Sequence, residues 1–399
     1  MLKLSSVAKF TVAIASALML GLGVTVDQAY GLIPSAKSSQ QVKTQPAQVL
    51  KNWGLDNTEQ LSHINARKAW KITRGSKKIV VAVIDTGVDP TQPDLKDNIC
   101  RFQGTDEYGY DFVTNKKNPL DAHGHGSHVS GIIAATGKTK AGASGVAPHI
   151  CIMAVRYYSD TASGAQNLAN TVKAINYAVD HGANVINYSG GGAEFSAPEM
   201  KAIQRAEAKG VVFVAAAGNE YQDTDKGGNA YYPAAYGLSN IIAVAATNIK
   251  NQILPSSNWG RKHVHVAAPG ENIYSTLPKG RYGYLTGTSQ ATAFVSGLAA
   301  LILSENPKLK PFEVREIIMK SVDHLASLEG KVASGGRINA YAALRMTVAR
   351  RDGGNSKLLA NLDKQDREEA HLKGTYALSG NNSPAVKKTI QAIRGVAYH

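Results

Sequence analysis

Five short runs rich in apolar, often β-branched residues limit the fold of this chain more than any other feature of its sequence. The first, Ile-Val-Val-Ala-Val-Ile at residues 79–84, is rich in β-branched side chains and has no alternating polar position. Such a run is typical of a strand that is buried on both faces of a parallel sheet. Similar runs follow at residues 150–155, 184–187, 211–215 and 241–245.

Helical patterns lie between these runs. Residues 167–181 carry apolar side chains at helical spacing and are followed by Gly182, a stop signal, while residues 198–209 begin at a proline and end before Gly210. This alternation predicts an α/β fold with three layers, in which helices cover both faces of a mostly parallel central sheet.

Residues 288–303 are apolar on nearly all sides, so we expect a helix buried in the centre of the fold rather than on its surface. Residues 313–322 and 339–348 predict two further helices. With 399 residues, of which 43% are hydrophobic, the chain can bury a large core, and a wholly disordered or fibrous protein is excluded.

The two ends differ in composition from the middle. Residues 1–31 combine Lys3 and Lys9 with an uncharged run at 10–26, and Ala29 and Gly31 suit a cleavage site, so we predict a signal peptide and a secreted (extracellular or periplasmic) protein. A permanent membrane anchor is the competing interpretation. Residues 32–51 predict a short leader or propeptide, residues 52–349 a catalytic domain, and residues 350–399 a polar C-terminal tail.

Charge and cysteine content bear on partners and on a disulfide bond rather than on the fold. The formal net charge of +14 favours contact with anionic surfaces but says nothing about the fold, and we predict no nucleic-acid partner. The two cysteines, Cys100 and Cys151, lack the spacing of a zinc site, and an exported protein permits one disulfide between them.

Three short segments carry residues suited to catalysis. Asp85 directly follows the first predicted strand, where α/β sheets place their ligands, although an aspartate there is commonly a turn residue. His123, His125 and His128 form a cluster that no nearby acid or cysteine completes as a metal site. Ser289 opens the buried helix, where a capping role alone would explain it.

Taken together, Asp-Thr-Gly at Asp85, His-Gly-Ser-His-Val-Ser-Gly from His125 and Gly-Thr-Ser-Gln-Ala-Thr around Ser289 resemble the motifs of the subtilisin-like serine proteases, the subtilase family, in the same chain order. The resemblance runs from about residue 53 to residue 344. It implies the subtilisin-like α/β fold and a secreted serine endopeptidase that hydrolyses peptide bonds. Ser289 would be the nucleophile, His125 the general base, Asp85 its partner, and Asn219 a donor to the oxyanion.

The same resemblance implies that an extended substrate peptide binds between two backbone segments. These segments are Ser163-Gly164 and Ser189-Gly190-Gly191. Because the family usually has a larger apolar residue where Gly190 stands, we expect a wide pocket and broad specificity. Ala217, Gly218 and Glu220 would line the pocket for the P1 residue, and Glu220 would favour a basic P1 side chain.

Other expectations follow from departures from the family pattern. No cofactor is required for this chemistry, and no metal ligand is assigned: two lysines at residues 136–142 stand where a calcium loop would supply oxygens, which leaves structural calcium uncertain. By resemblance, the segments at Cys100 and Cys151 form neighbouring strands, which predicts a disulfide; two buried thiols are the alternative. Partners are protein or peptide substrates, and we expect a monomer without a membrane span after processing.

Two substitutions bear on activity. Gln290 replaces the methionine that usually follows the nucleophile, and Ala293-Phe294 replaces a usual Pro-His pair. The second departure is the main support for an alternative interpretation, a secreted pseudoprotease or envelope-binding protein.

Overall fold

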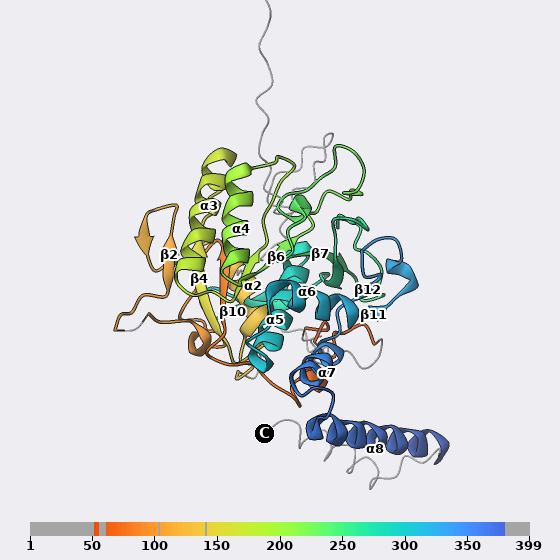
Figure 1. Ribbon diagram of the computed structural model, residues 1–399. Coiled ribbons are helices and arrows are strands. Elements are labelled where there is room, and N and C mark those ends of the chain that lie inside the picture. Colours follow the sequence, from red (N-terminus) through yellow and green to blue (C-terminus); the bar gives the residue numbers. More distant parts are fainter. Residues whose placement is uncertain (1–51, 56–60, 103, 140–141, 380–399) are drawn as a thin grey trace, which may run out of the picture.

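A computed structural model describes residues 52–55, 61–102, 104–139 and 142–379 of the chain (Figure 1). The predicted signal peptide and leader lie outside these residues. The strands are β1 (Val80–Asp85), β2 (Gly109–Asp111), β3 (Lys116–Lys117), β4 (Cys151–Arg156), β5 (Val185–Tyr188), β6 (Val212–Ala216), β7 (Ile241–Thr247), β8 (Val266–Pro269), β9 (Ile273–Leu277), β10 (Arg281–Leu285), β11 (Asp323–His324) and β12 (Gly336–Arg337). The helices are α1 (Ala66–Ala69), α2 (His125–Ala134), α3 (Gly164–Asp180), α4 (Ala197–Ala208), α5 (Thr288–Glu305), α6 (Pro311–Lys320), α7 (Ala340–Arg351) and α8 (Lys357–Ser379), with short 3₁₀ turns η2 (Lys96–Asn98), η3 (Ala234–Tyr236) and η4 (Ala326–Leu328).

Ten of these strands form one sheet in the order β11-β12-β8-β7-β6-β5-β1-β4-β2-β3. Its pairs from β2 to β12 are parallel, and only the outermost pairs, β2 with β3 and β11 with β12, are antiparallel. The five apolar runs form β1, β4, β5, β6 and β7, which confirms the predicted mostly parallel sheet. Strands β9 and β10 pair as a separate hairpin.

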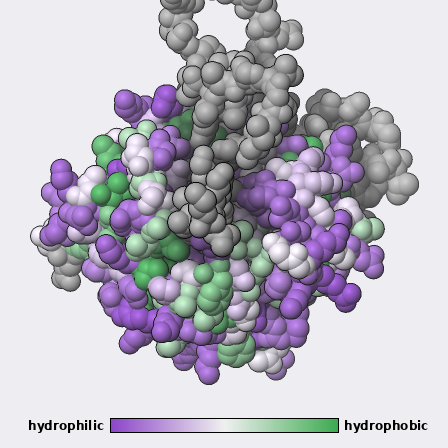
Figure 2. All heavy atoms as spheres, turned by 90° about the horizontal axis from the view of Figure 1, so that it is seen from above, coloured by the Kyte–Doolittle hydropathy of each residue, from purple (hydrophilic) through white to green (hydrophobic). Residues whose placement is uncertain are grey.

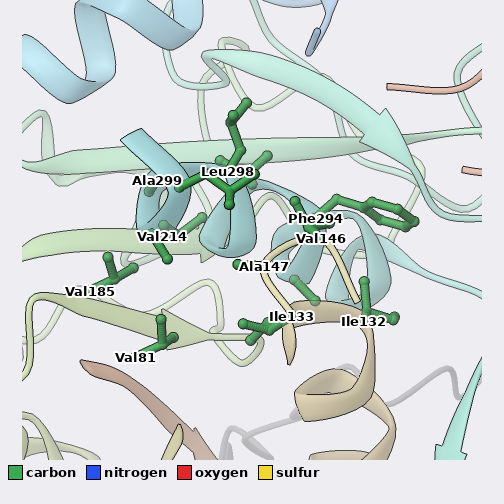
Figure 3. Close-up of a cluster of buried hydrophobic side chains, with 14 of the residues drawn as sticks. Val81, Ile132, Ile133, Val146, Ala147, Val185, Val214, Phe294, Leu298 and Ala299 are labelled. Carbon is green, nitrogen blue, oxygen red and sulfur yellow. The ribbon is translucent and has the colours of Figure 1, made fainter. Parts of the chain in front are cut away.

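Side chains of the central strands point alternately into two hydrophobic clusters, because successive residues of a strand face opposite sides of a sheet. Val81 and Val83 pack into the cluster formed with α2 and α5, whereas Ala82 and Ile84 pack into the cluster formed with α3 and α4. Figure 3 shows the first cluster, where Leu298 and Phe294 of α5 meet Ile132 and Ile133 of α2 and the valines of the sheet. Helices therefore cover both faces, as predicted.

Helix α5 is buried over almost its whole length. Every residue from Thr288 to Leu303 is buried, so the segment that is apolar on all sides occupies the centre of the molecule. By contrast, α3 and α4 are surface helices that lie side by side (Figure 1), and each begins at a serine whose hydroxyl accepts a hydrogen bond from the first turn.

The C-terminal region differs from the polar tail that composition suggested. Helix α7 continues to Arg351, across the expected boundary at residue 350, and α8 follows it (Figure 1). Leu362 of α8 is buried, and Asp366 accepts hydrogen bonds from Lys68 Nζ (3.2 Å) and Tyr341 Oη (2.8 Å). The first part of the region thus packs against the preceding part of the chain, with Leu362 buried and Asp366 bound to Lys68 and Tyr341.

Among the coloured residues of Figure 2, hydrophilic side chains predominate, with smaller hydrophobic patches between them. None of the helices in the described ranges combines the length and apolar character needed to cross a membrane.

The two cysteines form a disulfide bond, with Cα atoms 5.1 Å apart. Cys151 begins β4, and the backbone N–H of Cys100 donates to the carbonyl of Ile152 in the same strand (2.9 Å), so the two residues sit on adjacent extended segments. The predicted bridge is confirmed, and the alternative of two buried thiols is not.

We predict that the Cys100→Ala/Cys151→Ala variant loses roughly 4 kcal/mol of unfolding free energy, because the bridge closes a loop of 51 residues in the unfolded chain. Urea unfolding of the variant and the oxidised wild type measures the difference. Alkylation of two thiols in denatured, unreduced wild-type protein would contradict the bridge itself.

Candidate active site

Asp85 and His125 meet at the carboxyl end of the central sheet. Asp85 is the last residue of β1 and is buried, while His125 is the first residue of α2. His125 Nδ1 lies 2.8 Å from Asp85 Oδ1 and 3.0 Å from Oδ2, and the backbone N–H of Thr86 donates to the same Oδ1 (2.7 Å). The carboxylate therefore fixes Nδ1 of the imidazole as the protonated nitrogen, which leaves Nε2 as the proton acceptor.

Asp121, which sequence analysis did not single out, holds the turn that leads into α2. Its Oδ1 accepts from the backbone N–H groups of His123 (2.9 Å) and Gly124 (2.7 Å) and from the Thr86 hydroxyl (3.0 Å), and Oδ2 accepts from Ser127 N–H (2.9 Å). The sequence contains a signal for this role, since Asp121 stands four residues before the histidine that begins the helix. Aspartates at such positions accept hydrogen bonds from the backbone N–H groups of a helix start.

The pKa of His125 responds to two opposing effects. Burial lowers the pKa, whereas the charge of Asp85, its hydrogen bond and the charge of Asp121 raise it, and the net shift is upward from the ordinary value of 6.5. The ring therefore binds a proton more readily than a free imidazole does, a property that suits a general base.

Ser289 lies in the first turn of α5, and α5 packs against α2. Its hydroxyl donates to the carbonyl of Ser189 (3.2 Å), and the Ser189 hydroxyl donates in return to the carbonyl of Ser289 (3.3 Å). This reciprocal pair joins the start of the buried helix to the loop after β5. Asn187 Nδ2 donates to the Ser189 hydroxyl (3.1 Å) and Asn187 Oδ1 accepts from Ser296 (2.8 Å), so a buried polar chain supports the loop.

Asn219 is oriented by the start of the same helix. Its Oδ1 accepts from the backbone N–H (2.9 Å) and the hydroxyl (3.1 Å) of Thr288, the residue before Ser289. Because the amide oxygen accepts from Thr288, the donor group of the side chain, Nδ2, is fixed at the opposite position of the amide. The structure brings Asn219 and Ser289 together at one end of α5.

The two predicted peptide-binding segments face each other across a small cavity of about 20 Å³. Gly164 contributes to one wall and Gly191 to the other. Ser163 also has the structural role that its position suggests, because its hydroxyl accepts from Gln166 N–H (3.2 Å) and caps α3.

Two tyrosines lie beside Gly190, where a wide pocket is expected. A Cβ atom at Gly190 would lie 2.2 Å from the hydroxyl of Tyr157 and 3.1 Å from the ring of Tyr188. These tyrosines fill the space that a larger residue would occupy. The missing side chain at residue 190 is compensated by the large side chains of Tyr157 and Tyr188. The identity of residue 190 alone does not predict this compensation.

Ala217, Gly218 and Glu220, which are predicted to line the P1 pocket, differ in their exposure. The Ala217 side chain is fully buried in a hydrophobic cluster with Val264 and Leu328, so only its backbone can line a pocket. Gly218 has a φ of 100°, which favours glycine. The Glu220 side chain is exposed; partial desolvation raises the pKa of its carboxyl, and the hydrogen bond that Asn258 donates to it (2.6 Å) opposes this shift.

The described residues around Asp94 surround its carboxylate with hydrogen-bond donors, an arrangement that does not suit a calcium ion. Asp94, the acid that would coordinate it, already accepts hydrogen bonds from Lys138 N–H (2.9 Å), Thr139 N–H (3.1 Å), the Thr139 hydroxyl (2.9 Å) and Tyr282 Oη (2.7 Å). Donors on both oxygens replace the cation that the carboxylate would otherwise bind. Across the described ranges, no group of three or more His, Cys, Asp or Glu side chains is arranged to hold a metal.

The remaining residues of the motifs are structural. His128 is fully buried, and burial lowers its pKa to about 3, so the ring is neutral and donates to a backbone carbonyl of the β9–β10 hairpin. Ala293 and Phe294 are both fully buried, and Figure 3 shows Phe294 within the core cluster. The departure at these two positions is therefore a change in core packing.

Glu199, in the first turn of α4, was not identified from the sequence. It is 3% exposed and lines the cavity between the two peptide-binding segments. Burial raises its pKa to about 7, and a hydrogen bond from Tyr236 Oη to Oε2 (2.7 Å) lowers it only in part. A glutamate near a helix N-terminus has a ready structural explanation, so the sequence gives no reason to place it at a site.

An α/β sheet with an Asp–His pair at the end of its first strand, and with a serine and an asparagine joined at the start of a buried helix, defines a serine peptidase of the α/β class. The model of the subtilase family matches residues 76–359, and the chain belongs to that family. Its catalytic domain is that of a subtilisin-like serine endopeptidase.

Curated relatives agree with this assignment. A thermophilic serine proteinase from Bacillus sp. (strain AK1) is 41% identical over 276 residues, which cover 69% of this chain and 64% of that protein. Thermitase from Thermoactinomyces vulgaris is 38% identical over 71% of this chain and 94% of its own length. The major intracellular serine protease of Bacillus subtilis (strain 168) is 39% identical over 62% of this chain and 75% of its own length.

We predict that Glu199→Gln stabilises the protein above pH 7. The Glu199 carboxyl has a higher pKa in the folded than in the unfolded protein. The unfolding free energy of the wild type therefore falls as pH rises from about 4.5 to about 7. The variant avoids this loss, on the order of 2–3 kcal/mol at pH 8, and gains nothing at pH 4.

Thermal unfolding of both proteins across this pH range measures the effect, and the difference between them cancels contributions from the buried histidines. Glu194→Gln, at an exposed position, is the matched control and should change little. A Glu199→Gln variant whose advantage is the same at pH 4 and pH 8 would show that the carboxyl is not desolvated.

Proposed function

We propose that the protein is a secreted serine endopeptidase in which Asp85, His125 and Ser289 act as a catalytic triad and Asn219 stabilises the oxyanion. The observation that carries the proposal is the Asp85–His125 contact of 2.8 Å at the carboxyl end of the central strand β1. Family membership supports the reaction class, and the geometry supports the assignment of roles.

In this mechanism the Ser289 hydroxyl turns from the Ser189 carbonyl toward the substrate. As Oγ bonds to the scissile carbonyl carbon, Nε2 of His125 takes its proton, and Asp85 stabilises the imidazolium that forms. The oxyanion accepts hydrogen bonds from Ser289 N–H and from Nδ2 of Asn219. His125 then protonates the leaving amine as the C–N bond breaks, and water hydrolyses the acyl-enzyme by the same steps in reverse.

Secretion is supported by the lysines and uncharged run at residues 1–31 and by the Cys100–Cys151 disulfide, which persists in oxidising compartments. The intracellular relative shows that family membership alone does not decide location. N-terminal sequencing of protein recovered from the culture medium tests the proposal, and full-length protein retained in the cell would contradict it.

For substrates, we propose extended peptides bound between residues 163–164 and 189–191 by a monomer that needs no cofactor and no calcium in the loop at 136–142. Broad specificity stays a prediction for the P1 residue, where the exposed Glu220 would favour a basic side chain. The tyrosines beside Gly190 argue against an equally open site farther along the peptide.

The pseudoprotease alternative has lost its main support, because Ala293 and Phe294 are core residues. Basic charge remains compatible with contact to an anionic envelope, and such contact would accompany catalysis rather than replace it.

We predict that Asp85→Asn lowers kcat by roughly 10⁴-fold, because the amide no longer holds the reactive tautomer of His125. In wild-type protein the acidic limb of kcat/KM should titrate above pH 6.5, since the net shift of the His125 pKa is upward. Asp85→Asn should move that limb to lower pH. Peptide hydrolysis measured from pH 5 to 9 tests both effects, and an unchanged kcat would remove Asp85 from the site.

We also predict that activity survives peroxide doses that oxidise methionine. Gln290 is 1% exposed, and its Oε1 lies near Gly287, next to Asn219. A methionine here would become a larger, polar sulfoxide beside the oxyanion site. Peroxide titration should inactivate Gln290→Met at lower doses than wild type, whereas equal loss in both would show that residue 290 does not control oxidative sensitivity.

A further inference from the structure

The cavity between the two peptide-binding segments has an acidic floor that the catalytic mechanism does not use. Thr171 and Gly164 line it from the side of α3, Tyr188 and Gly191 from the end of β5, and Glu199 from α4. Glu199 forms none of the hydrogen bonds that join Asp85, His125, Asn219 and Ser289 to their partners.

The Glu199 carboxylate is poorly compensated for a buried charge. The Tyr236 hydroxyl donates to it, and Tyr188 and Tyr231 are near enough for its charge to act on them. Burial and this charge raise the pKa values of all three tyrosines, so they stay neutral. Glu194 lines the same cavity, and none of the lining residues is basic. In the part of the chain that the structure describes, no ion pair involves Glu199.

A buried carboxylate that accepts one hydrogen bond from an uncharged tyrosine lowers the stability of the protein, because this bond does not offset the free energy of removing the charge from water. Destabilising buried charges of this kind are more common at functional sites than elsewhere in proteins. A cation that entered the cavity from the substrate would supply the missing partner.

Size decides which cation fits. A cavity of about 20 Å³ has room for roughly one water-sized group. An ammonium group has this size, whereas an aromatic ring or a planar guanidinium is larger. The three N–H donors of an ammonium group would also match the acceptors present, which are the Glu199 carboxylate, the Thr171 hydroxyl and the Tyr188 hydroxyl. The two hydroxyl oxygens are 3.3 Å apart.

We propose that this cavity is a lysine-selective subsite, in which Glu199 binds the ammonium group of a substrate lysine away from the scissile bond. The inference rests on the proposed function, because it takes the two segments as the peptide-binding walls. Ser189 contacts Ser289, and Gly191 lies two residues farther along, so the lysine sits about two to four residues from the scissile bond at roughly 3.3 Å per residue.

Equilibrium binding to the Ser289→Ala variant tests the subsite without requiring turnover. The probes are a set of fluorescent peptides with one sequence, in which a single norleucine is replaced by lysine at each position except P1. One lysine peptide should bind about tenfold more tightly than its norleucine parent, as expected for a charge-assisted hydrogen bond. Glu199→Gln, which keeps a group that Tyr236 can bind, should abolish the preference.

Glu329→Gln on the same background, at an exposed position outside the cavity lining, is the matched control and should retain the preference, which excludes a general effect of negative charge. The preference should also be larger at pH 8.5 than at pH 6, because Glu199 titrates near pH 7. Thermal unfolding shows whether each variant is folded. If Glu199→Gln does not fold, the same peptides are bound to Glu199→Leu, which should bind the norleucine peptide more tightly than the lysine peptide.

Equal binding of lysine and norleucine peptides at every position would overturn the subsite, as would a preference lost in Glu329→Gln and kept in Glu199→Gln. Failure of the proposed function is seen separately, as absence of turnover of the parent peptide by wild-type protein. A lysine preference without turnover would support the subsite and reject the enzyme, and turnover without a preference would do the opposite.

Discussion

Burial of α5 is the constraint on which the rest of the structure depends. A helix that is apolar on all sides must lie inside the molecule, so its first turn, rather than an exposed face, carries Ser289. The sheet and α2 pack around it, and the loops after β5 and β6 meet its start through Ser189 and Asn219. The position of the reactive serine is therefore a consequence of core packing.

Much of this arrangement is predictable because it depends on patterns that few alternatives satisfy. Runs rich in apolar residues predict β1, β4, β5, β6 and β7 to within about two residues. Helical spacing predicts α3, a proline start and a glycine stop predict α4, and a segment apolar on nearly all sides predicts α5. The assignment of Asp85, His125 and Ser289 rests on motifs that occur together in one chain order, and that of Asn219 on the resemblance of its segment to the family. The short strands β2, β3, β11 and β12 were not predicted, since two or three residues carry too little periodicity.

What the sequence did not reveal depends on distant side chains. Glycine at residue 190 suggests open space, but Tyr157, which directly follows β4, lies where a side chain at residue 190 would point. Glu199 lies in a helix start where a glutamate is unremarkable, and only the neighbouring tyrosines make its charge costly. Composition likewise suggested a separate tail after residue 350, whereas Leu362 and Asp366 attach α8 to the domain. Each case needs a tertiary contact to interpret it.

The central claim is that Ser289 is a nucleophile activated by His125. Labelling with a fluorophosphonate, followed by intact mass and peptide mapping, tests this claim most directly because the reagent bonds to an activated serine hydroxyl. The account predicts one adduct per chain on Ser289, none in Ser289→Ala, and strongly slowed labelling in His125→Ala. Unlabelled wild-type protein, or labelling that persists in Ser289→Ala, would contradict it.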